Sequence, residues 1–283
     1  MKRVGIIGLG LMGSSLGLAL KRRGLAAVAG WARREETRRL AVELSVVDEV
    51  FDTPKAAVQG ADIAVFCTPV CSIPDLVRDC AGGFKPGAVV TDVGSTKAEL
   101  MRIVVPLLKG TGAAFVGSHP MAGSDKTGVE AGRADLYEGA ITAVTGDPET
   151  PMQAVDDVTW MWSGVGCRVV PLNPLDHDIL VARTSHLPHL VAALLARTVG
   201  RDAVPLVGDF CGTGFRDATR IAAGSPEMWH DIVKTNRAAL LDELWAYDAA
   251  LLELIGKLEK DDFDGIRDLL AAARETRSSL LKA

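Results

Sequence analysis

Histidine is the side chain best suited to proton transfer near neutral pH, and one histidine of this chain stands directly after an apolar run. The five histidines are His119, His177, His186, His189 and His230. His119 lies in FVGSHPMAGSDKTGVEAG, at the end of a predicted strand. A histidine there can act as general base on a bound ligand, whereas a structural histidine would only fix the loop. We expect His119 to be catalytic.

The segment SHLPHL carries His186 and His189, three residues apart. This spacing can place two metal ligands on one helix face, but Pro188 disturbs the helix and no glutamate completes a zinc-protease motif. Contacts to a substrate and buried hydrogen bonds between helices are the two interpretations we keep. We expect no metal site.

Residues 212–231, GTGFRDATRIAAGSPEMWHD, are rich in glycine, then basic, then helical in pattern. In a helix, Arg216 and Arg220 would share a face and could hold carboxylates through bidentate hydrogen bonds. The alternative is a pair of arginines exposed to solvent. Trp229, in the same segment, fits a binding site or a core equally well.

The stretch KRVGIIGLGLMGSSLGLALKRRG, residues 2–24, reads as strand, glycine turn and helix. Gly8 allows a tight turn, Gly10 allows close approach of a pyrophosphate, and Gly13 allows the helix to pack close to the strand. The N-terminus of the helix offers unpaired N–H groups to phosphates. The sequence therefore predicts a dinucleotide site, and a glycine turn without a ligand is the alternative.

The second predicted strand, residues 26–31, is followed by Ala32, Arg33 and Arg34. A NAD site of this kind usually has an acid at this place, which accepts hydrogen bonds from the ribose hydroxyls. Here there is no acid, and two guanidinium groups stand where a 2′-phosphate would lie. We expect NADP rather than NAD, although both arginines could simply begin a solvated helix.

Further strands are expected at residues 63–67, 88–92, 113–117, 141–145 and 167–170, with helices at 73–80, up to 108 and at 152–162. Strands that alternate with helices predict a doubly wound, mostly parallel α/β sheet of the Rossmann type. Ligands of such sheets bind beyond the carboxyl ends of the strands. We expect residues 68–69, 94–95 and 118–119 to meet at one mouth.

The pattern changes after Pro174. Residues 175–199, with Pro188 inside, 226–258 and 263–281 are expected to be helices, with no substantial strand between them. The sequence therefore predicts two domains, a dinucleotide-binding domain at 1–173 and an all-helical domain at 174–283.

Composition limits the class of protein. The chain has 283 residues, 48% of them hydrophobic, and a net charge of −5, which disfavours nucleic acid and anionic membranes as partners. Its five cysteines are sparse and odd in number, as expected of thiols in a reducing compartment. We expect no signal peptide and no membrane span, hence a cytoplasmic protein.

Five blocks, in order, resemble the prephenate/arogenate (cyclohexadienyl) dehydrogenases of tyrosine biosynthesis. The blocks are GLGLMGSSLGLAL, TDVGSTK, FVGSHPMAGSDKTGVEAGRADLYEG, SHLPHLVA and GFRDATRIAAGSPEMW, and they span nearly the whole chain. The resemblance implies oxidative decarboxylation of prephenate or arogenate with hydride transfer to a nicotinamide. It also implies that the helical domain is a dimerisation domain and that the protein is a homodimer.

The resemblance implies site residues by position. The histidine of GSHPMAG, here His119, assists deprotonation of the ring hydroxyl, and the serine of VGS, here Ser95, lies beside it. The arginine of ATRIA, here Arg220, pairs with a substrate carboxylate. The other implied substrate contacts are Ser124, Asp125, His186, His189, Arg216, Asp217 and Trp229. Many relatives have a glutamate after the HPMAG loop, where this chain has Asp125, one carbon shorter.

Cofactor contacts are expected at the glycine turn and at the following strand ends. They are Gly8, Leu9, Gly10, Leu11, Met12, Gly13, Ala32, Arg33, Arg34, Cys67, Thr68, Pro69, Val93 and Gly94. The residues after Trp31 are similar to those of the NADP-using subgroup.

Two other functions are considered. A β-hydroxyacid dehydrogenase shares the GLGxMG turn, but it needs a catalytic lysine on a helix after the nucleotide domain, and no lysine beyond Pro174 has that setting. A sensor that binds NADP without turnover needs only the glycine turn, whereas this chain also has His119, Ser95, His189 and Arg220. The sequence leaves prephenate and arogenate as alternative substrates.

Overall fold

The computed structural model describes residues 1–124, 126–201 and 205–281. The chain forms two compact units, Met1–Arg237 and Ala238–Ala283. The first unit contains the nucleotide-type sheet together with the helices that follow it up to Arg237. The domain boundary that we expect between residues 173 and 174 therefore lies inside this unit, and it stays a prediction.

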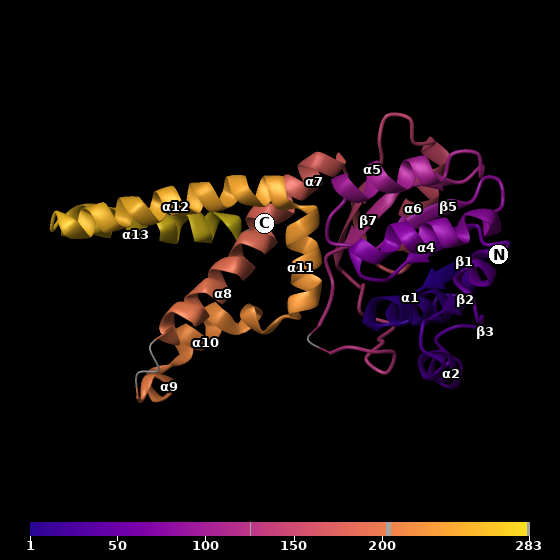
Figure 1. Ribbon diagram of the computed structural model, residues 1–283, viewed down its shortest axis with the longest axis horizontal. Coiled ribbons are helices and arrows are strands. Elements are labelled where there is room, and N and C mark those ends of the chain that lie inside the picture. The colour runs from indigo at the N-terminus through magenta and orange to yellow at the C-terminus, as the bar shows by residue number, and fades with distance from the viewer. Residues whose placement is uncertain (125, 202–204, 282–283) are drawn as a thin grey trace. The chain divides into compact units, whose positions relative to one another are not determined.

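A six-stranded parallel sheet organises the first unit (Figure 1). Its strands are β1 (Lys2–Ile7), β2 (Ala26–Trp31), β3 (Glu49–Val50), β4 (Ile63–Phe66), β5 (Val89–Asp92) and β6 (Ala114–Phe115). They lie in the order β3-β2-β1-β4-β5-β6, and every pair is parallel. This is the strand order of the Rossmann fold, so the expected fold class is confirmed.

Helices cover both faces of this sheet. They are α1 (Leu11–Arg22), α2 (Glu35–Glu43), α3 (Pro54–Val58), α4 (Ile73–Cys80) and α5 (Ala98–Leu107), with short turns η1 (Val70–Ser72) and η2 (Ala81–Gly83). Along β4, Ile63 and Val65 enter one core, while Ala64 and Phe66 enter the other. A strand buried on both faces must be apolar throughout, which is why these strands read as continuous apolar runs.

The later strands form a second, three-stranded sheet. Its strands are β7 (Gly117–Pro120), β8 (Ile141–Thr145) and β9 (Arg168–Leu172), with α6 (Met152–Gly164) between β8 and β9. β7 is antiparallel to β8, and β8 is parallel to β9. The single strand expected at residues 113–117 is wrong, because the chain leaves the first sheet after β6 and enters the second at Gly117.

Helices complete the first unit. They are α7 (Pro174–Val181), α8 (Leu187–Val199), α9 (Val207–Phe210), α10 (Thr213–Thr219) and α11 (Pro226–Thr235), with the π-helical turn η3 (Ala182–His186) and the 3-10 turn η5 (Arg220–Ala223). A proline cannot donate to the preceding turn, and here the helix widens to a π-turn just before Pro188.

The single helix expected at residues 226–258 is wrong. Helix α11 ends at Thr235 and α12 (Arg237–Glu259) begins after Asn236. Asn236 leaves the helical conformation, with φ −119° and ψ 30°. Its buried amide nitrogen donates to the carbonyl of Asp178 at 2.8 Å and to Nδ1 of His186 at 3.2 Å, and these two contacts hold Asn236 at the break.

The expectation of no membrane-length apolar helix also needs correction. Residues Pro174–Val199 are long and apolar enough to cross a membrane by length and composition, with a mean hydropathy of 1.4. The same stretch buries His177, Asp178, His186 and His189. These four polar groups pack against the rest of the first unit, whereas large apolar side chains of the same stretch, among them Leu175, Leu180 and Leu194, are exposed. The exclusion of a membrane partner stays a prediction.

The second unit is a pair of helices, α12 and α13 (Phe263–Leu280), joined by residues 260–262. The side chain of Asp262 caps α13 by accepting a hydrogen bond from the Gly265 N–H at 2.9 Å. Several large apolar side chains of this pair are exposed, among them Trp245, Leu252, Leu258, Phe263 and Leu270.

The glycine turn gives a stability prediction. A Cβ on Gly13 would lie 2.0 Å from the Gly8 carbonyl oxygen, whereas a Cβ on Gly10 would meet nothing within 4 Å. We expect Gly13→Ala to lower the free energy of unfolding by about 1–3 kcal/mol, because α1 must shift. The matched variant Gly10→Ala should lose less than about 1 kcal/mol. Urea denaturation measures both, and equal losses would contradict the packing role of Gly13.

Candidate active site

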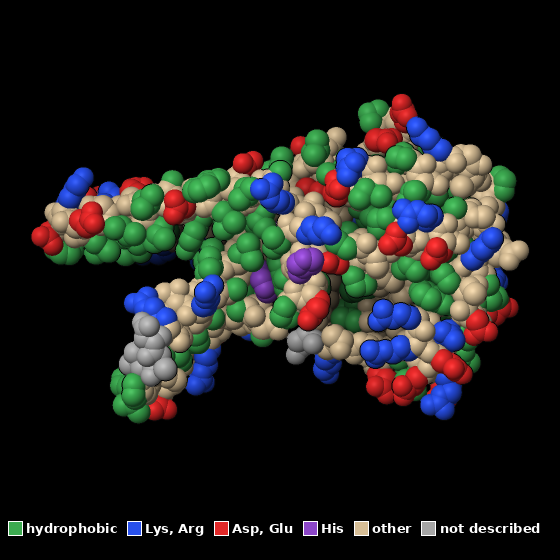
Figure 2. Space-filling model, viewed as in Figure 1, with side chains coloured by type: hydrophobic (Ala, Val, Ile, Leu, Met, Phe, Trp, Pro, Cys, Tyr) green, Lys and Arg blue, Asp and Glu red, His purple; other side chains and the backbone are tan. Residues whose placement is uncertain are grey.

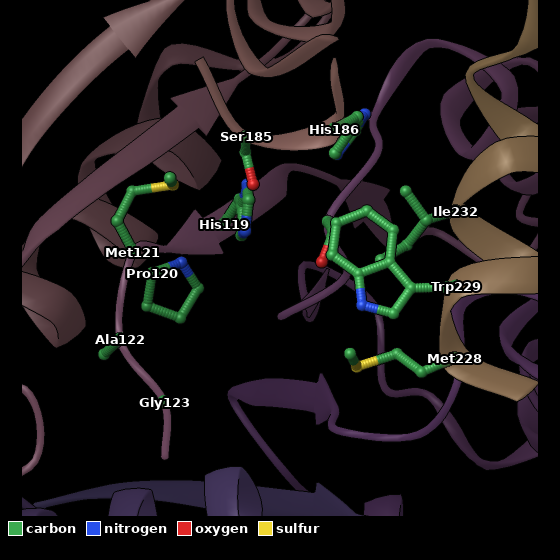
Figure 3. Close-up of a pocket in the computed structure, with 11 residues that line it drawn as sticks. His119, Pro120, Met121, Ala122, Gly123, Ser185, His186, Met228, Trp229 and Ile232 are labelled. Atoms are coloured by element: carbon green, nitrogen blue, oxygen red, sulfur yellow. The ribbon is translucent and has the colours of Figure 1, made fainter. Parts of the chain in front are cut away.

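A cavity of about 320 Å³ opens beside the end of β7. It is lined by Ser95, His119, Pro120, Met121, Ala122, Gly123, Ser185, His186, Met228, Trp229 and Ile232. These residues come from the loop after β5, from β7 and its following loop, from η3 and from α11. In Figure 3, His119 and Ser185 face the side chains of α11 across the opening. Residues far apart in sequence thus meet in one cavity.

His119 lies on β7 and is only 9% exposed. Its Nδ1 lies 2.9 Å from Nε2 of His177, and the two rings meet edge to face at 73°. His177 belongs to α7. The side chain that bonds to His119 therefore comes from the helices that follow the two sheets.

A carboxylate determines the direction of this hydrogen bond. The Nδ1 of His177 lies 2.8 Å from Oδ1 of Asp178, and an ionised carboxylate can only accept. His177 therefore donates from Nδ1, which leaves its Nε2 as an acceptor for Nδ1–H of His119. It follows that Nε2 of His119 carries a free lone pair. The arrangement orients His119 as a base in a defined tautomer.

Asp178 is itself held by the start of α5. Its two carboxylate oxygens accept from the backbone N–H groups of Lys97 and Ala98, at 2.8 and 2.9 Å. These are unpaired donors at the positive end of a helix, where a negative charge is stabilised. These bonds fix the carboxylate in place.

The electrostatic surroundings keep His119 neutral. Burial is the largest cause that lowers its pKa well below 6.5, and the charges of His177, Lys97 and His186 act in the same direction. An imidazole with a lowered pKa is unprotonated at neutral pH. His119 is therefore ready to accept a proton.

Ser95 lines the cavity from the loop between β5 and α5. Its side chain is half-buried, and its hydroxyl has no hydrogen-bond partner among the residues that the structure describes. Ser95 and His119 thus share the cavity, as expected, with the serine hydroxyl available to a ligand.

His186 and His189 occupy different positions. His186 lines the cavity and accepts at Nδ1 from the amide of Asn236 at 3.2 Å, and burial lowers its pKa to about 4. His189 is buried and stacks on Trp229 with ring centroids 3.4 Å apart. Gly224 lies against this stack, since a Cβ there would be 2.7 Å from the indole Nε1. His186 thus forms the hydrogen bond between helices, while Trp229 presents its ring to the cavity.

The expected basic residues lie elsewhere. Arg216 and Asp217 are exposed on α10, and Arg220 is exposed at the start of η5. None of the three lines the cavity, and none has a side-chain partner within the described ranges 1–124, 126–201 and 205–281. Ser124 is exposed just beyond the cavity-lining Gly123. Asp125 lies outside the described residues.

Sequence reasoning missed several residues of this site. His177 has no role in the sequence-based prediction, and Asp178, Lys97 and Ser185 are absent from it. The apolar wall of Met121, Met228 and Ile232 is also absent. Lys97 and Asp178 could have been found because each is a charged residue within or beside an apolar stretch. Charged residues are rarely buried unless they are paired, so such a position predicts a buried partner.

The expected cofactor residues gather at one edge of the first sheet. Gly8, Ala32, Cys67 and Val93 follow β1, β2, β4 and β5, and parallel strands end at the same edge. The strand order reverses between β1 and β4, where ligands of such sheets bind. Leu9, Leu11, Met12, Gly13, Thr68, Pro69 and Gly94 lie in the same turns and loops.

The glycine turn fits a dinucleotide. Gly8 has φ +105°, which a side chain rarely adopts, and a Cβ there would meet the Cys67 carbonyl oxygen at 2.7 Å. The space before Gly10 is open. Helix α1 begins at Leu11 with no side-chain cap and no acid in its first turn, so its first N–H groups are available to a pyrophosphate.

Arg33 and Arg34 lie directly before α2 and are exposed. Neither guanidinium has a partner within the described part of the chain. Arg38, by contrast, donates to the carbonyl of Ala32 at 2.8 Å. Lys and Arg side chains gather over the region of α1 and α2 in Figure 2. The guanidiniums of Arg33 and Arg34 thus stand free beside the turn, next to Glu35 and Glu36 at the start of α2.

No group of three or more His, Cys, Asp or Glu side chains that could hold a metal ion occurs among the described residues.

The chain matches two family models over most of its length. One, described as the nucleotide-binding domain of prephenate dehydrogenase, matches residues 16–171. The other, described as the dimerization domain of prephenate dehydrogenase, matches residues 173–272. Prephenate dehydrogenase of Bacillus subtilis (strain 168) is 33% identical over 279 residues, which make up 97% of this chain and 75% of that protein.

Two solved structures are similar over the whole chain. Prephenate dehydrogenase from A. aeolicus, in complex with hydroxyphenyl propionate and NAD+, has a TM-score of 0.92 at 29% identity and covers 99% of this chain and 98% of its own. Synechocystis arogenate dehydrogenase has a TM-score of 0.86 at 30% identity and covers 99% and 100%. These relatives are named for two different substrates.

The histidine geometry predicts a titration pattern. We expect His119 to remain neutral well below pH 6.5 and His186 to protonate at about pH 4, since burial disfavours both charged forms. NMR of imidazole-labelled protein measures both midpoints. The ¹⁵N shifts should report Nδ1–H for His119. A midpoint of 6.5 or above, or an Nε2–H tautomer, would contradict the orientation by His177.

Proposed function

The chain belongs to the prephenate dehydrogenase family, and we propose that it oxidatively decarboxylates prephenate or arogenate with hydride transfer to NADP. One observation carries the proposal. The buried His119, with its Nδ1 bonded to His177, leaves a lone pair on Nε2 in a cavity that it shares with the free hydroxyl of Ser95. That is the arrangement required to take a proton from a ring hydroxyl.

The protein residues account for the proton. Nε2 of His119 accepts the hydroxyl proton while the adjacent C–H bond breaks, which leaves a ketone. The bound nicotinamide supplies the hydride acceptor. Loss of the ring carboxylate as carbon dioxide returns its electron pair to the ring, which becomes aromatic, and the proton held by His119 can return to the phenolic oxygen. Ser95 orients the hydroxyl by hydrogen bonding.

His177 and Asp178 support this step. When His119 takes the proton, it becomes a cation in a buried site, which is costly without a compensating charge. The bond from its Nδ1–H to His177, and from His177 to the carboxylate of Asp178, connects that cation to a fixed negative charge. The carboxylate thus favours the protonated intermediate state without receiving the proton.

The cavity lining and the family resemblance together assign the remaining residues. The apolar wall of Met121, Met228 and Ile232, together with Trp229, encloses a cyclohexadiene ring. His189 positions Trp229 through the stack. Arg220 is proposed to pair with a substrate carboxylate, and Arg216, Asp217, Ser124 and Asp125 are proposed as further contacts. Since Arg216, Asp217 and Arg220 are exposed, they can reach a ligand from this chain or from a partner subunit.

NADP is proposed because of the charges at the end of β2. The unpaired guanidiniums of Arg33 and Arg34 follow Ala32, and arginine matches phosphate oxygens in a bidentate manner. The A. aeolicus relative was solved with NAD+, so NAD is the alternative that the test must separate from NADP.

A homodimer is proposed from the helices of the second unit. Its exposed apolar side chains, among them Trp245 at 69% and Phe263 at 65%, need a partner surface in water. The matching family model is described as a dimerization domain. Location in the cytoplasm, with no nucleic-acid or membrane partner, stays a prediction from composition.

Initial rates test the reaction. Prephenate and arogenate are each combined with NADP and NAD, and nicotinamide reduction is followed. We expect turnover with NADP on at least one of the two acids, and which acid reacts decides the name of the activity. His119→Asn should bind NADPH normally but turn over about 10²–10⁴-fold more slowly, because it lacks the base. An unchanged rate would overturn the role of His119.

Absence of turnover in all four combinations, with NADPH still bound, would instead favour the sensor hypothesis.

The double variant Arg33→Ala/Arg34→Ala tests the cofactor. We expect its kcat/KM for NADP to fall by about 10- to 100-fold, since each lost charge-assisted contact to a phosphate is worth about 1.5–3 kcal/mol before solvent screening reduces it. Its kcat/KM for NAD should change little. Arg39→Ala, on the exposed face of α2 and paired with Glu43, is the matched control. Equal losses with both cofactors would contradict recognition of a 2′-phosphate.

A further inference from the structure

A fully buried ion pair lies beneath the cavity, and the mechanism above does not use it. Asp92, the last residue of β5, and Lys97, directly before α5, both have 0% exposure. The Lys97 ammonium donates to the Asp92 carboxylate. Removing both charges from water costs several kcal/mol per ion, and apolar residues of similar size often stabilise a core equally well. Stability alone therefore does not account for this pair.

The pair is bonded to the backbone beside both expected catalytic residues. Lys97 Nζ donates to the carbonyl oxygen of Ser118 at 2.9 Å, and Oδ1 of Asp92 accepts from the Ser118 N–H at 3.1 Å. The other carboxylate oxygen accepts from the Gly94 N–H at 2.7 Å. Ser118 precedes His119, and Gly94 precedes Ser95. One ion pair thus joins the two chain segments that carry the base and the serine.

Close packing leaves this junction little freedom. A Cβ on Gly117 would lie 3.0 Å from Cδ of Lys97, and a Cβ on Gly94 would lie 2.8 Å from Oδ2 of Asp92. The Ser118 hydroxyl is enclosed as well, since it accepts from the Trp162 indole at 2.9 Å. Because the glycines allow the backbone to approach the pair, Ser118 and Gly94 both lie directly against it.

We propose that Lys97, held by Asp92, is a positioning residue that fixes Ser95 and His119 relative to each other. The inference rests on the proposed roles of Ser95 and His119. The ion pair connects the two sheets. Asp92 is the last residue of β5 in the parallel sheet, and Ser118, to which the pair is bonded, lies on β7 in the second sheet. The Ser118 hydroxyl also bonds to the Asp92 carbonyl oxygen and to the Thr91 hydroxyl, but Lys97 and the Asp92 carboxylate supply the bonds to the Ser118 backbone and to the Gly94 N–H. Loss of Lys97 would let His119 shift against Ser95.

The positive charge of Lys97 also acts on His119. The charged and titratable groups around His119 are Lys97 and Asp92 below it, His177 and Asp178 on α7, and His186 on η3. Removing the lysine cation makes protonation of His119 less unfavourable. A variant without this charge should therefore show a His119 titration midpoint at higher pH than the wild type.

Lys97→Met tests the proposal, because methionine fills much of the space without donating. We expect kcat to fall by about 10- to 100-fold, as a shift of about 1 Å of a catalytic group does. The KM for the ring substrate should change less than about threefold. Lys97→Gln should recover part of kcat, because its amide can still donate to Asp92 or Ser118.

Lys85→Met is the matched control. It removes the lysine of the Lys85–Asp62 ion pair, which lies at the amino ends of β4 and β5, away from the cavity. Its kcat and its His119 midpoint should equal those of the wild type. If Lys97→Met does not fold, Lys97→Gln carries the test, with a lower kcat expected than in the wild type.

The two proposals fail in different ways. An inactive wild type would overturn the proposed function, while the NMR midpoint of His119 would still test the effect of Lys97. An active wild type with an unchanged kcat in the folded Lys97 variant would overturn the positioning role. A fall in kcat without any rise of the His119 midpoint would overturn the electrostatic part.

Discussion

The carboxylate of Asp178 is the group on which the site depends. It accepts two backbone N–H bonds at the start of α5 and one bond from His177. The first two contacts attach α7 to the nucleotide-type sheet, and the third fixes the tautomer of His177 and hence of His119. The same side chain therefore joins two parts of the fold and orients His119. A neutral amide in its place could not accept all three bonds in the same way.

Much of the fold follows from local pattern. The strands of the parallel sheet are short apolar runs followed by glycine or polar turns, because both faces of the sheet are buried. This pattern predicts that they are strands and that they alternate with helices. The second sheet was not predicted as a separate sheet, because the change of sheet at Gly117 involves no break in the apolar run. The division of the long helix at Asn236 depends on its hydrogen bonds to Asp178 and His186, which are distant in sequence.

The site divides in the same manner. His119, Ser95 and the glycine turn were predictable because each lies at a strand end, and parallel strands bring their carboxyl ends together. His177 and Asp178 were not, since their value comes from contacts made 58 and 80 residues away along the chain. The arginines at 216 and 220 show the converse. Their spacing predicts that they share a helix face and bind carboxylates, yet in this chain alone both are exposed to solvent.

The contact between His119 and His177 bears on how such a chain can be recombined. The two family models meet at about residue 172, which marks a natural joint for exchange between relatives. His119 lies before that joint, while His177, which accepts its hydrogen bond, and Asp178, which caps α5, lie after it. A hybrid joined there would take its glycine turn and His119 from one parent. The residues that set the tautomer of His119 would come from the other parent. Compatibility at positions 177 and 178 thus limits which halves of this family can be exchanged.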